Sequence, residues 1–311
     1  MATESRPGAS TPPQHPAHRD RADDWVIAPS GQRYWGLNGA AGLLAHDADR
    51  GVLLQHRAPW SHQGGTWGLP GGARHMGESA MAGALRECAE EAAVPRASLR
   101  TKATYVLDLD VWSYTTVVAD VVTPFEAEIA DAESLALEWV PVAEVDQREL
   151  HPGFAAAWPS LLGLAVARPV LVVDAANVLG ARPDGWWRDR GEATSRLVGR
   201  IDSLAEAGLA GAELGIEAHA VMPRVIAVVE GEARGVPSAG RVEIVEAGRD
   251  GDSEVVAQAR SLADGGADVT VVTSDRGLRA RLPDSVRMRG AGWLRDLTDG
   301  RAPTGDGFTD A

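Results

Sequence analysis

Residues 72–94 read GARHMGESAMAGALRECAEEAAV, and this stretch decides the fold predicted for the first half of the chain. On a helix, Glu87, Glu90 and Glu91 fall at positions i, i+3 and i+4, so three carboxylates share one face, while apolar residues on the other side can pack onto a sheet. Three like charges so close destabilise an isolated helix, and a bound cation is their natural compensation. The spacing therefore predicts a helix over residues 78–92 that carries a metal site.

A tight turn precedes this helix at residues 69–72, which read LPGG. Because two of its positions lack a β-carbon, a backbone carbonyl can approach an ion closely there. Hard divalent ions such as Mg²⁺ take oxygen ligands and usually retain waters and substrate phosphates. The turn and the acids together indicate chemistry on a pyrophosphate.

The motif as a whole resembles the signature of the Nudix hydrolase family. Gly72 is followed after five residues by Glu78 and after seven more by RECAEE at residues 86–91. Residues 67–71, WGLPG, are similar to the approach loop of the family. The resemblance implies an α/β/α sandwich with a mixed sheet, and Mg²⁺-dependent attack of water on a nucleoside diphosphate linked to another group, with Mn²⁺ as an alternative ion.

Two positions depart from the family pattern. Ala93 stands where the family has its last glycine, which stiffens the exit from the helix, and Cys88 occupies an aliphatic position as a small hydrophobe. The acids of the motif are all present. A solvated, salt-bridged surface helix is the alternative interpretation, and such a helix needs neither the glycine turn nor this spacing.

The resemblance implies a role for each acid of the motif. Glu90 and Glu91 would ligate the metal with help from the Gly72 carbonyl, and Glu87 would act either as a further ligand or as the base that activates water.

It also implies roles for residues beside these acids. Arg86 would orient the carboxylates through a pair with Glu90, and Glu78 would brace the loop. Some Nudix enzymes carry a further acid before the last core strand, and Glu133, six residues before Trp139, is the candidate here.

The substrate is less closely defined than the reaction. Trp112 and Tyr114 could stack on a base, although aromatic residues in a strand also serve packing. Residues 112–117, WSYTTV, resemble the same segment of bacterial enzymes grouped with nucleotide-pool cleaners, and residues 96–123 lack the proline that marks many ADP-ribose enzymes of the family. We expect a nucleoside triphosphate or a modified version of one.

In the second half of the chain, acids follow short apolar runs. Asp174, with Asn177 three residues on, follows residues 170–173, and Asp275 follows residues 269–273. Asp252 precedes a run with helical periodicity. The alternation of strands and helices predicts a parallel sheet covered on both faces, whose strand ends meet at one edge. We therefore expect these four side chains to converge on a divalent metal.

This arrangement resembles the PIN-like and NYN nuclease superfamily, which implies a Rossmann-like sheet and metal-dependent cleavage of RNA. Trp186 and Trp187 could offer a stacking platform for single-stranded RNA, although paired tryptophans also serve as core or interface. Asp is common at helix caps and turns for purely structural reasons, so a domain that only binds is the alternative. A further hypothesis makes the Nudix module a nucleotide sensor that regulates this nuclease.

Length and composition set the frame for these motifs. With 311 residues, 44% of them hydrophobic, the chain can fill two cores. Its formal net charge of -14 argues against a duplex DNA binder with a broad basic surface, and one cysteine excludes an internal disulfide framework. We expect a cytoplasmic protein that enters no membrane, because no apolar stretch is long enough and the start lacks a secretory signal. The oligomeric state is left undetermined.

The predicted organisation is a flexible tail at 1–24, the Nudix domain at 25–166, the PIN/NYN-like domain at 167–300 and a second tail at 301–311. The strands expected in the first domain are 34–46, 51–56, 101–108, 113–122 and 138–141, and those in the second are 170–173, 225–229, 241–245 and 269–273.

Overall fold

The computed structural model describes residues 20–183 and 185–300, so most of the predicted tail at 1–24 and all of the tail at 301–311 lie outside the described residues. The chain divides into two compact units. One holds the residues up to 101 together with 105–165, and the other holds 102–104 together with the residues from Val166 onward. Residues 21–22 form a turn in which Ala22 is fully buried, and Asp20 accepts a hydrogen bond from the Met76 amide.

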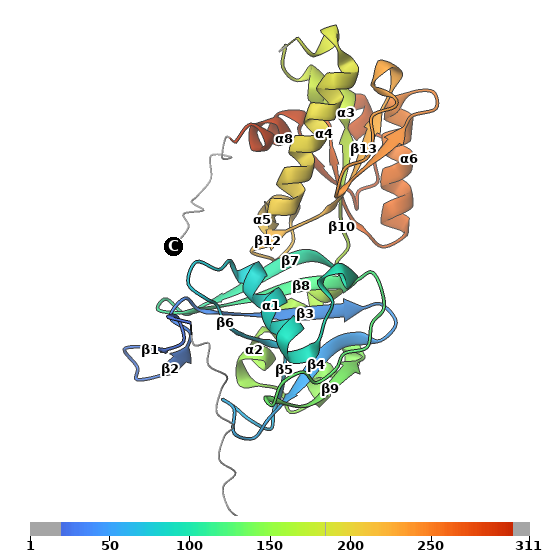
Figure 1. The fold of residues 1–311 in the computed structure, drawn as a ribbon. Helices are drawn as coiled ribbons and strands as arrows, with labels where there is room; N and C mark the ends of the chain where they lie inside the picture. Colours follow the sequence, from blue (N-terminus) through green and yellow to red (C-terminus); the bar gives the residue numbers. More distant parts are fainter. Residues whose placement is uncertain (1–19, 184, 301–311) are drawn as a thin grey trace, which may run out of the picture. The chain divides into compact units, whose positions relative to one another are not determined.

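The first unit is built on a mixed sheet (Figure 1). The strands β7, β8, β3, β4 and β5 are neighbours in this order, with β6 paired to β3 and β9 paired to β4. Strand β3 runs parallel to β8 and antiparallel to β4 and β6, as a mixed sheet requires. The strands are β3 (Ala40–Asp47), β4 (Gly51–Arg57), β5 (Trp67–Gly68), β6 (Gly71–Ala73), β7 (Leu99–Asp108), β8 (Ser113–Val121) and β9 (Ser134–Val140).

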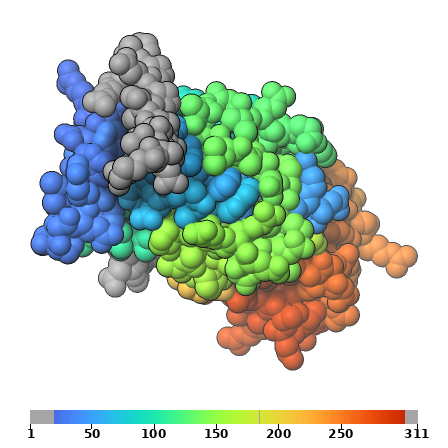
Figure 2. Space-filling view, turned by 90° about the horizontal axis from the view of Figure 1, so that it is seen from below, coloured from blue at the N-terminus to red at the C-terminus, as the bar shows by residue number. Residues whose placement is uncertain are grey.

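A short antiparallel pair precedes this sheet. Strands β1 (Trp25–Ile27) and β2 (Arg33–Trp35) project as a small lobe at the edge of the unit (Figures 1 and 2). The single strand predicted at 34–46 is wrong, because the chain breaks between β2 and β3. Gly36 and Gly39 take φ angles of 96° and 77°, which extended strands do not allow.

Helix α1 (Ala80–Ala92) lies across one face of this sheet (Figure 1). It begins two residues later than predicted, because the Ser79 hydroxyl accepts a hydrogen bond from the Ala82 amide and caps the helix. At the other end Ala93 takes the left-handed conformation, with φ 51°. The buried face of α1 packs against β3, β4 and β8 through Ala84, Leu85, Cys88 and Ala92.

Cys88 is therefore a core residue, and burial raises the pKa of its thiol. The remaining helical elements of this unit are η1 (Arg96–Ser98), η2 (Val142–Gln147) and α2 (Pro152–Val166).

The second unit contains a five-stranded sheet in which every strand pairing is parallel. The order is β14, β13, β10, β15, β16, so β10 is central. Four of these strands match predicted runs within two residues at each end; β16 was missed because its sequence, Arg-Met-Arg, carries no apolar pattern. The strands are β10 (Pro169–Asp174), β13 (Arg224–Val229), β14 (Val242–Glu246), β15 (Asp268–Val272) and β16 (Arg287–Arg289).

Helices cover both faces of this sheet, with α4 (Arg190–Ala207) and α6 (Gly251–Asp264) on opposite sides (Figure 1). Alternate residues of β10 enter different cores: Leu171 and Val173 pack with α4, whereas Val170 and Val172 pack with α6. The other elements are α3 (Ala175–Gly180), η3 (Trp186–Arg188), β11 (Leu209–Ala210), α5 (Gly211–Leu214), β12 (Ala220–Val221), η4 (Gly231–Ala233), α7 (Arg276–Arg279) and α8 (Ala291–Thr298).

Among the helices of residues 20–183 and 185–300, we find none with the length and apolar character that a membrane span needs.

Candidate active site

The glycine turn and the acids of α1 are in direct contact. A β-carbon at Gly72 would lie 2.7–2.8 Å from the carboxylate atoms of Glu87, so only glycine lets β6 pass this close. The Gly71 amide donates a hydrogen bond of 2.8 Å to Glu91 Oε2. Glu91 is buried, Glu87 is half-buried and Glu90 is exposed. The three carboxylates therefore run from the protein interior to the surface beside the turn.

Arg86 links the acids to the preceding loop. Its guanidinium contacts both oxygens of Glu78 at 2.9 Å, Glu87 Oε1 at 2.8 Å and Glu90 Oε2 at 3.1 Å, and it donates to the Ala73 carbonyl at 3.0 Å. The predicted pair with Glu90 is thus one contact among several. The pair with Glu78 is bidentate, with two hydrogen bonds. These bonds lower the pKa of Glu78 and raise that of Arg86.

Glu78 contacts the loop before α1, as the sequence analysis predicts. Its Oε2 accepts a hydrogen bond of 3.0 Å from the His75 amide, and its backbone carbonyl accepts from the Arg74 guanidinium. The loop between β6 and α1 is therefore tied to the helix through Glu78 and Arg86.

The two inner acids lie where their ionised forms are disfavoured. Burial, then the nearby Glu87, Asp131 and Glu133 carboxylates, raise the pKa of Glu91 to about 8, against the opposing Gly71 hydrogen bond. Burial also raises the pKa of Glu87, although Arg86 opposes the shift. A divalent cation would remove this repulsion.

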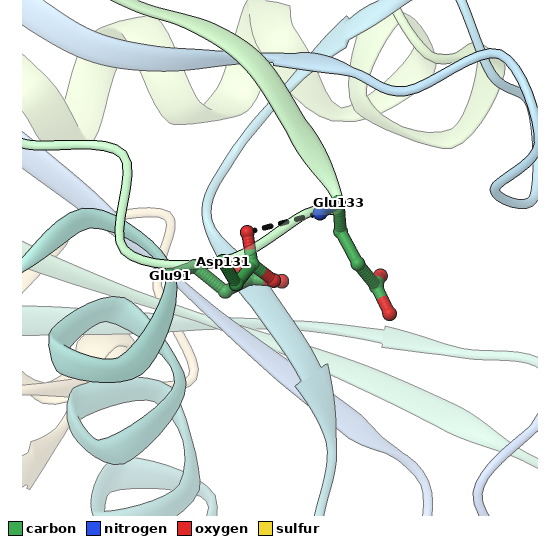
Figure 3. Close-up of side chains that lie close together, drawn as sticks. All are labelled: Glu91, Asp131 and Glu133. Atoms are coloured by element: carbon green, nitrogen blue, oxygen red, sulfur yellow. Dashed lines mark hydrogen bonds between the residues drawn. The ribbon is translucent and has the colours of Figure 1, made fainter. Parts of the chain in front are cut away.

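Two further acids reach Glu91 from the loop before β9. Carboxylate oxygens of Glu91, Asp131 and Glu133 lie within 4.8 Å of one another (Figure 3). The Glu133 amide donates to Asp131 Oδ1 at 3.1 Å, and the loop is held to α1 by a bond from the Ala130 amide to the Glu91 carbonyl. Glu133 was a sequence candidate. Asp131 was missed, although an acid two residues from that candidate was the available signal.

All the candidate metal-ligand atoms are carboxylate or carbonyl oxygens, the set that suits Mg²⁺ or Mn²⁺. The tight approach of Gly72 to Glu87 leaves its backbone beside the acids. The residues present therefore fit a hard divalent cation.

The two aromatic candidates differ in how much of their surface is engaged. Trp112 stacks on Tyr34 at 4.9 Å, and its indole donates to the carbonyls of Trp35 and Gly36. One face of this ring is thus already covered, which favours packing for Trp112. A β-carbon at Gly42 would lie 2.1 Å from the Tyr114 hydroxyl, so Tyr114 extends over β3 beside the glycine turn.

In the second unit, the four predicted residues line one cavity of about 640 Å³: Asp174, Asn177, Asp252 and Asp275. The cavity lies where β10 ends, at the point where the strand order reverses and ligands of open α/β sheets bind. Glu230, Ser274 and Trp186 also line it, whereas the exposed Trp187 is not part of the lining.

Three of these residues also make structural hydrogen bonds. Asp174, 7% exposed, accepts from the Asn177 amide at 3.1 Å and from the Thr273 hydroxyl at 3.0 Å. Asn177 accepts from the Ser274 amide, and Asp275 caps α7. Burial raises the pKa of Asp174, and the Asp252 carboxylate adds to the shift.

Asp252 stands apart from these three. It lies in the first turn of α6, and Asp250 rather than Asp252 caps that helix. Burial and then the Asp275 carboxylate raise the pKa of Asp252. The Asp275 carboxylate therefore opposes the ionisation of Asp252.

A mixed sheet, a glycine turn and a helix whose glutamates converge with loop acids define a hydrolase of the Nudix class. The family model for the NUDIX domain matches residues 36–160. Over 163 residues the chain is 47% identical to "Putative 8-oxo-dGTP diphosphatase 3" of Mycobacterium tuberculosis, which covers 49% of this chain and 75% of that protein. The chain belongs to the Nudix family and is a hydrolase acting on pyrophosphate bonds.

Two other relatives agree in sequence. A "Nucleoside triphosphate pyrophosphatase/Nudix hydrolase fusion protein" of Bifidobacterium longum is 40% identical over 156 residues, covering 48% of this chain and 32% of that protein. The crystal structure of a Nudix hydrolase from M. smegmatis, RenU, is 45% identical and covers 45% of this chain and 92% of that one, with a TM-score of 0.41.

The family model ends at residue 160, so the likeness of the second unit to the PIN/NYN superfamily stays a prediction.

Proposed function

We propose that the N-terminal domain, residues 25–166, hydrolyses nucleoside triphosphates. The preferred substrate would be a triphosphate with a modified base, such as the 8-oxo-dGTP in the name of the relative. The observation that carries this proposal is the convergence of Glu87, Glu91 and the loop acids beside the glycine turn. The chain's net charge of -14 repels a triphosphate, and Arg86 is already paired with three glutamates, so a bound cation would supply the attraction.

Mg²⁺ or Mn²⁺ would be held by Glu90 and Glu91, with the Gly72 carbonyl and Glu133, and Glu87 would be either a further ligand or the base that activates water. When bound, the ion supplies positive charge to the phosphoryl oxygens and promotes ionisation of the attacking water. The water oxygen attacks phosphorus, and the phosphoanhydride bond breaks with its electron pair passing to the bridging oxygen.

Glu87 is our candidate for the group that takes the proton of this water. Arg86 holds its Oε1, which leaves Oε2 to act, and burial has already moved its pKa upward, toward the range a general base needs. Arg86 keeps Glu87 and Glu90 oriented, and Glu78 keeps Arg86 in place. We propose Tyr114 as a base contact beside the turn, and Trp112 as the residue that supports it, since their rings lie 6.2 Å apart.

The test is a screen of nucleotides with Mg²⁺ or Mn²⁺ in which every product is identified, comparing the full chain with Glu90→Gln and Glu91→Gln. We expect each substitution to lower kcat at least about a hundredfold, in line with the loss of an electrostatic catalytic group. Glu144→Gln, an exposed acid of η2, is the matched control. Full activity in both site variants would contradict the proposal, and tight nucleotide binding without product would favour the sensor hypothesis.

We propose a second function, metal-dependent cleavage of single-stranded RNA, for the domain at residues 167–300. It is favoured by the gathering of Asp174, Asn177, Asp252 and Asp275 in one cavity with Trp186. Asp252→Asn is the sharpest probe, because Asp174 and Asp275 also hold structure. We expect it to abolish RNA cleavage in Mn²⁺ while Asp264→Asn, at the far end of α6, has no effect. RNA that is bound but not cut by the wild type would instead assign a binding role.

A further inference from the structure

A buried polar chain leads from the sheet to the loop acids of the candidate active site. Gln55 lies on β4 and is 0% exposed, and its amide nitrogen donates to Ser134 Oγ at 2.8 Å. Ser134, the first residue of β9, is 7% exposed, and its hydroxyl contacts Asp131 Oδ1 at 3.2 Å. Gln55 is thus connected in series to two side chains of a segment that lies almost 80 residues further along the sequence.

The direction of this chain is fixed by chemistry. An ionised carboxylate only accepts hydrogen bonds, so the Ser134 hydroxyl donates its one hydrogen bond to Asp131. Its oxygen is then free to accept the proton of the Gln55 amide nitrogen. The Glu133 amide donates to the same oxygen of Asp131 at 3.1 Å. Two donors on one oxygen orient the carboxylate toward its partners.

This series of hydrogen bonds is not an efficient way to stabilise a core. Gln55 Oε1 is buried and finds no hydrogen-bond partner among the residues that the structure describes. An apolar side chain of similar volume would avoid the desolvation of this atom. Buried polar atoms left without a partner are uncommon, so an atom of this kind is worth explaining.

The acids of the site need such support. Carboxylate oxygens of Glu91, Asp131 and Glu133 lie within 4.8 Å, where like charges repel. The backbone is fixed by bonds from Ala130 to the Glu91 carbonyl and from the Ala58 amide to the Glu133 carbonyl at 2.7 Å. The side chain of Glu91 is held by Gly71, and that of Asp131 by Ser134.

We propose that Gln55 and Ser134 are positioning residues that hold Asp131 against Glu91 and Glu133 and so increase the affinity of the site for a divalent cation. Partners that orient metal ligands typically change metal affinity by 10- to 100-fold when removed. The inference rests on the proposed function, because it needs this acidic cluster to be the cation site.

The test measures Mn²⁺ binding to the full chain without nucleotide, by electron paramagnetic resonance, and the Mg²⁺ dependence of hydrolysis. Mn²⁺ bound at this site is the fraction lost in Glu91→Gln, which separates it from any ion in the second domain. We expect Gln55→Met and Ser134→Ala each to weaken binding about tenfold or more, and the double variant to be no weaker than a single one, since both break one chain. Ser134→Thr, which keeps the hydroxyl, should bind like the wild type.

The possible outcomes separate the two proposals. If Glu91→Gln loses Mn²⁺ and hydrolysis while Gln55→Met and Ser134→Ala bind as the wild type does, the positioning role is wrong and the proposed function stands. If Glu91→Gln keeps both, the proposed function is wrong. If Gln55→Met does not fold, the comparison of Ser134→Ala with Ser134→Thr decides. Gln147→Met, an exposed change in η2, controls for handling.

Discussion

Replacing Glu91 with Gln should make the metal-free first unit more stable while it destroys the cation site. The pKa of Glu91 is raised to about 8 from 4.5, so the folded state holds this proton more tightly than the unfolded state. The stability that this proton provides is complete below the unfolded pKa and is lost as the pH rises through the folded one. Gln keeps an acceptor for the Gly71 amide but does not titrate.

The size of the effect follows from the shift. One pKa unit corresponds to about 1.4 kcal/mol, so between pH 5 and pH 8 the wild type should lose about 3 kcal/mol of unfolding free energy relative to Glu91→Gln. Mg²⁺ should restore this loss in the wild type at pH 8, because binding to the folded state stabilises it, and should do so much less in the variant.

The assay must report on the first unit alone, because one transition cannot describe a chain with two units. Hydrogen exchange of peptides from β3 and α1, read by mass spectrometry in EDTA at both pH values, provides this. An unfolding free-energy difference between the two proteins that is the same at pH 5 and pH 8 would refute the reasoning.

Three further predictions test the contacts around the turn. Gly72→Ala should lower kcat about a hundredfold with little loss of secondary structure, because the new β-carbon displaces the Glu87 carboxylate; steady-state kinetics and circular dichroism check this, and unchanged kcat would contradict it. Arg86→Lys keeps the charge but loses the planar fork, so we expect roughly a tenfold loss of kcat and about 1–3 kcal/mol of stability in the same assays. Gly42→Ala should destabilise the first unit by collision with the Tyr114 hydroxyl, and Tyr114→Phe should restore part of the loss; a double variant no more stable than Gly42→Ala would rule out this steric account.

The site could be predicted where local geometry determines it. Helical spacing alone places Glu87 and Glu91 on one face, and the glycine turn that precedes the helix allows the close contact seen at Gly72. Asp131 could not be predicted in the same way. It lies in a loop whose position depends on the bond from Ala130 to the Glu91 carbonyl, which joins segments about 40 residues apart and leaves no periodic signal.

In the second sheet, too, some features could be predicted from the sequence and others could not. Its buried strands follow from continuous β-branched runs, and the meeting of strand ends follows from their parallel direction. Asp250 caps α6 and Asp252 lies two residues further on, and composition does not resolve a helix start to that precision.

Arg86 gives the first unit a built-in counter-ion. It already joins Glu78, Glu87 and Glu90 to the backbone of β6, so the motif is cross-linked without any metal. Chelation should therefore act as a reversible off-switch and leave the native shape in place. An enzyme prepared in EDTA should regain turnover on the time scale of mixing, with no refolding lag.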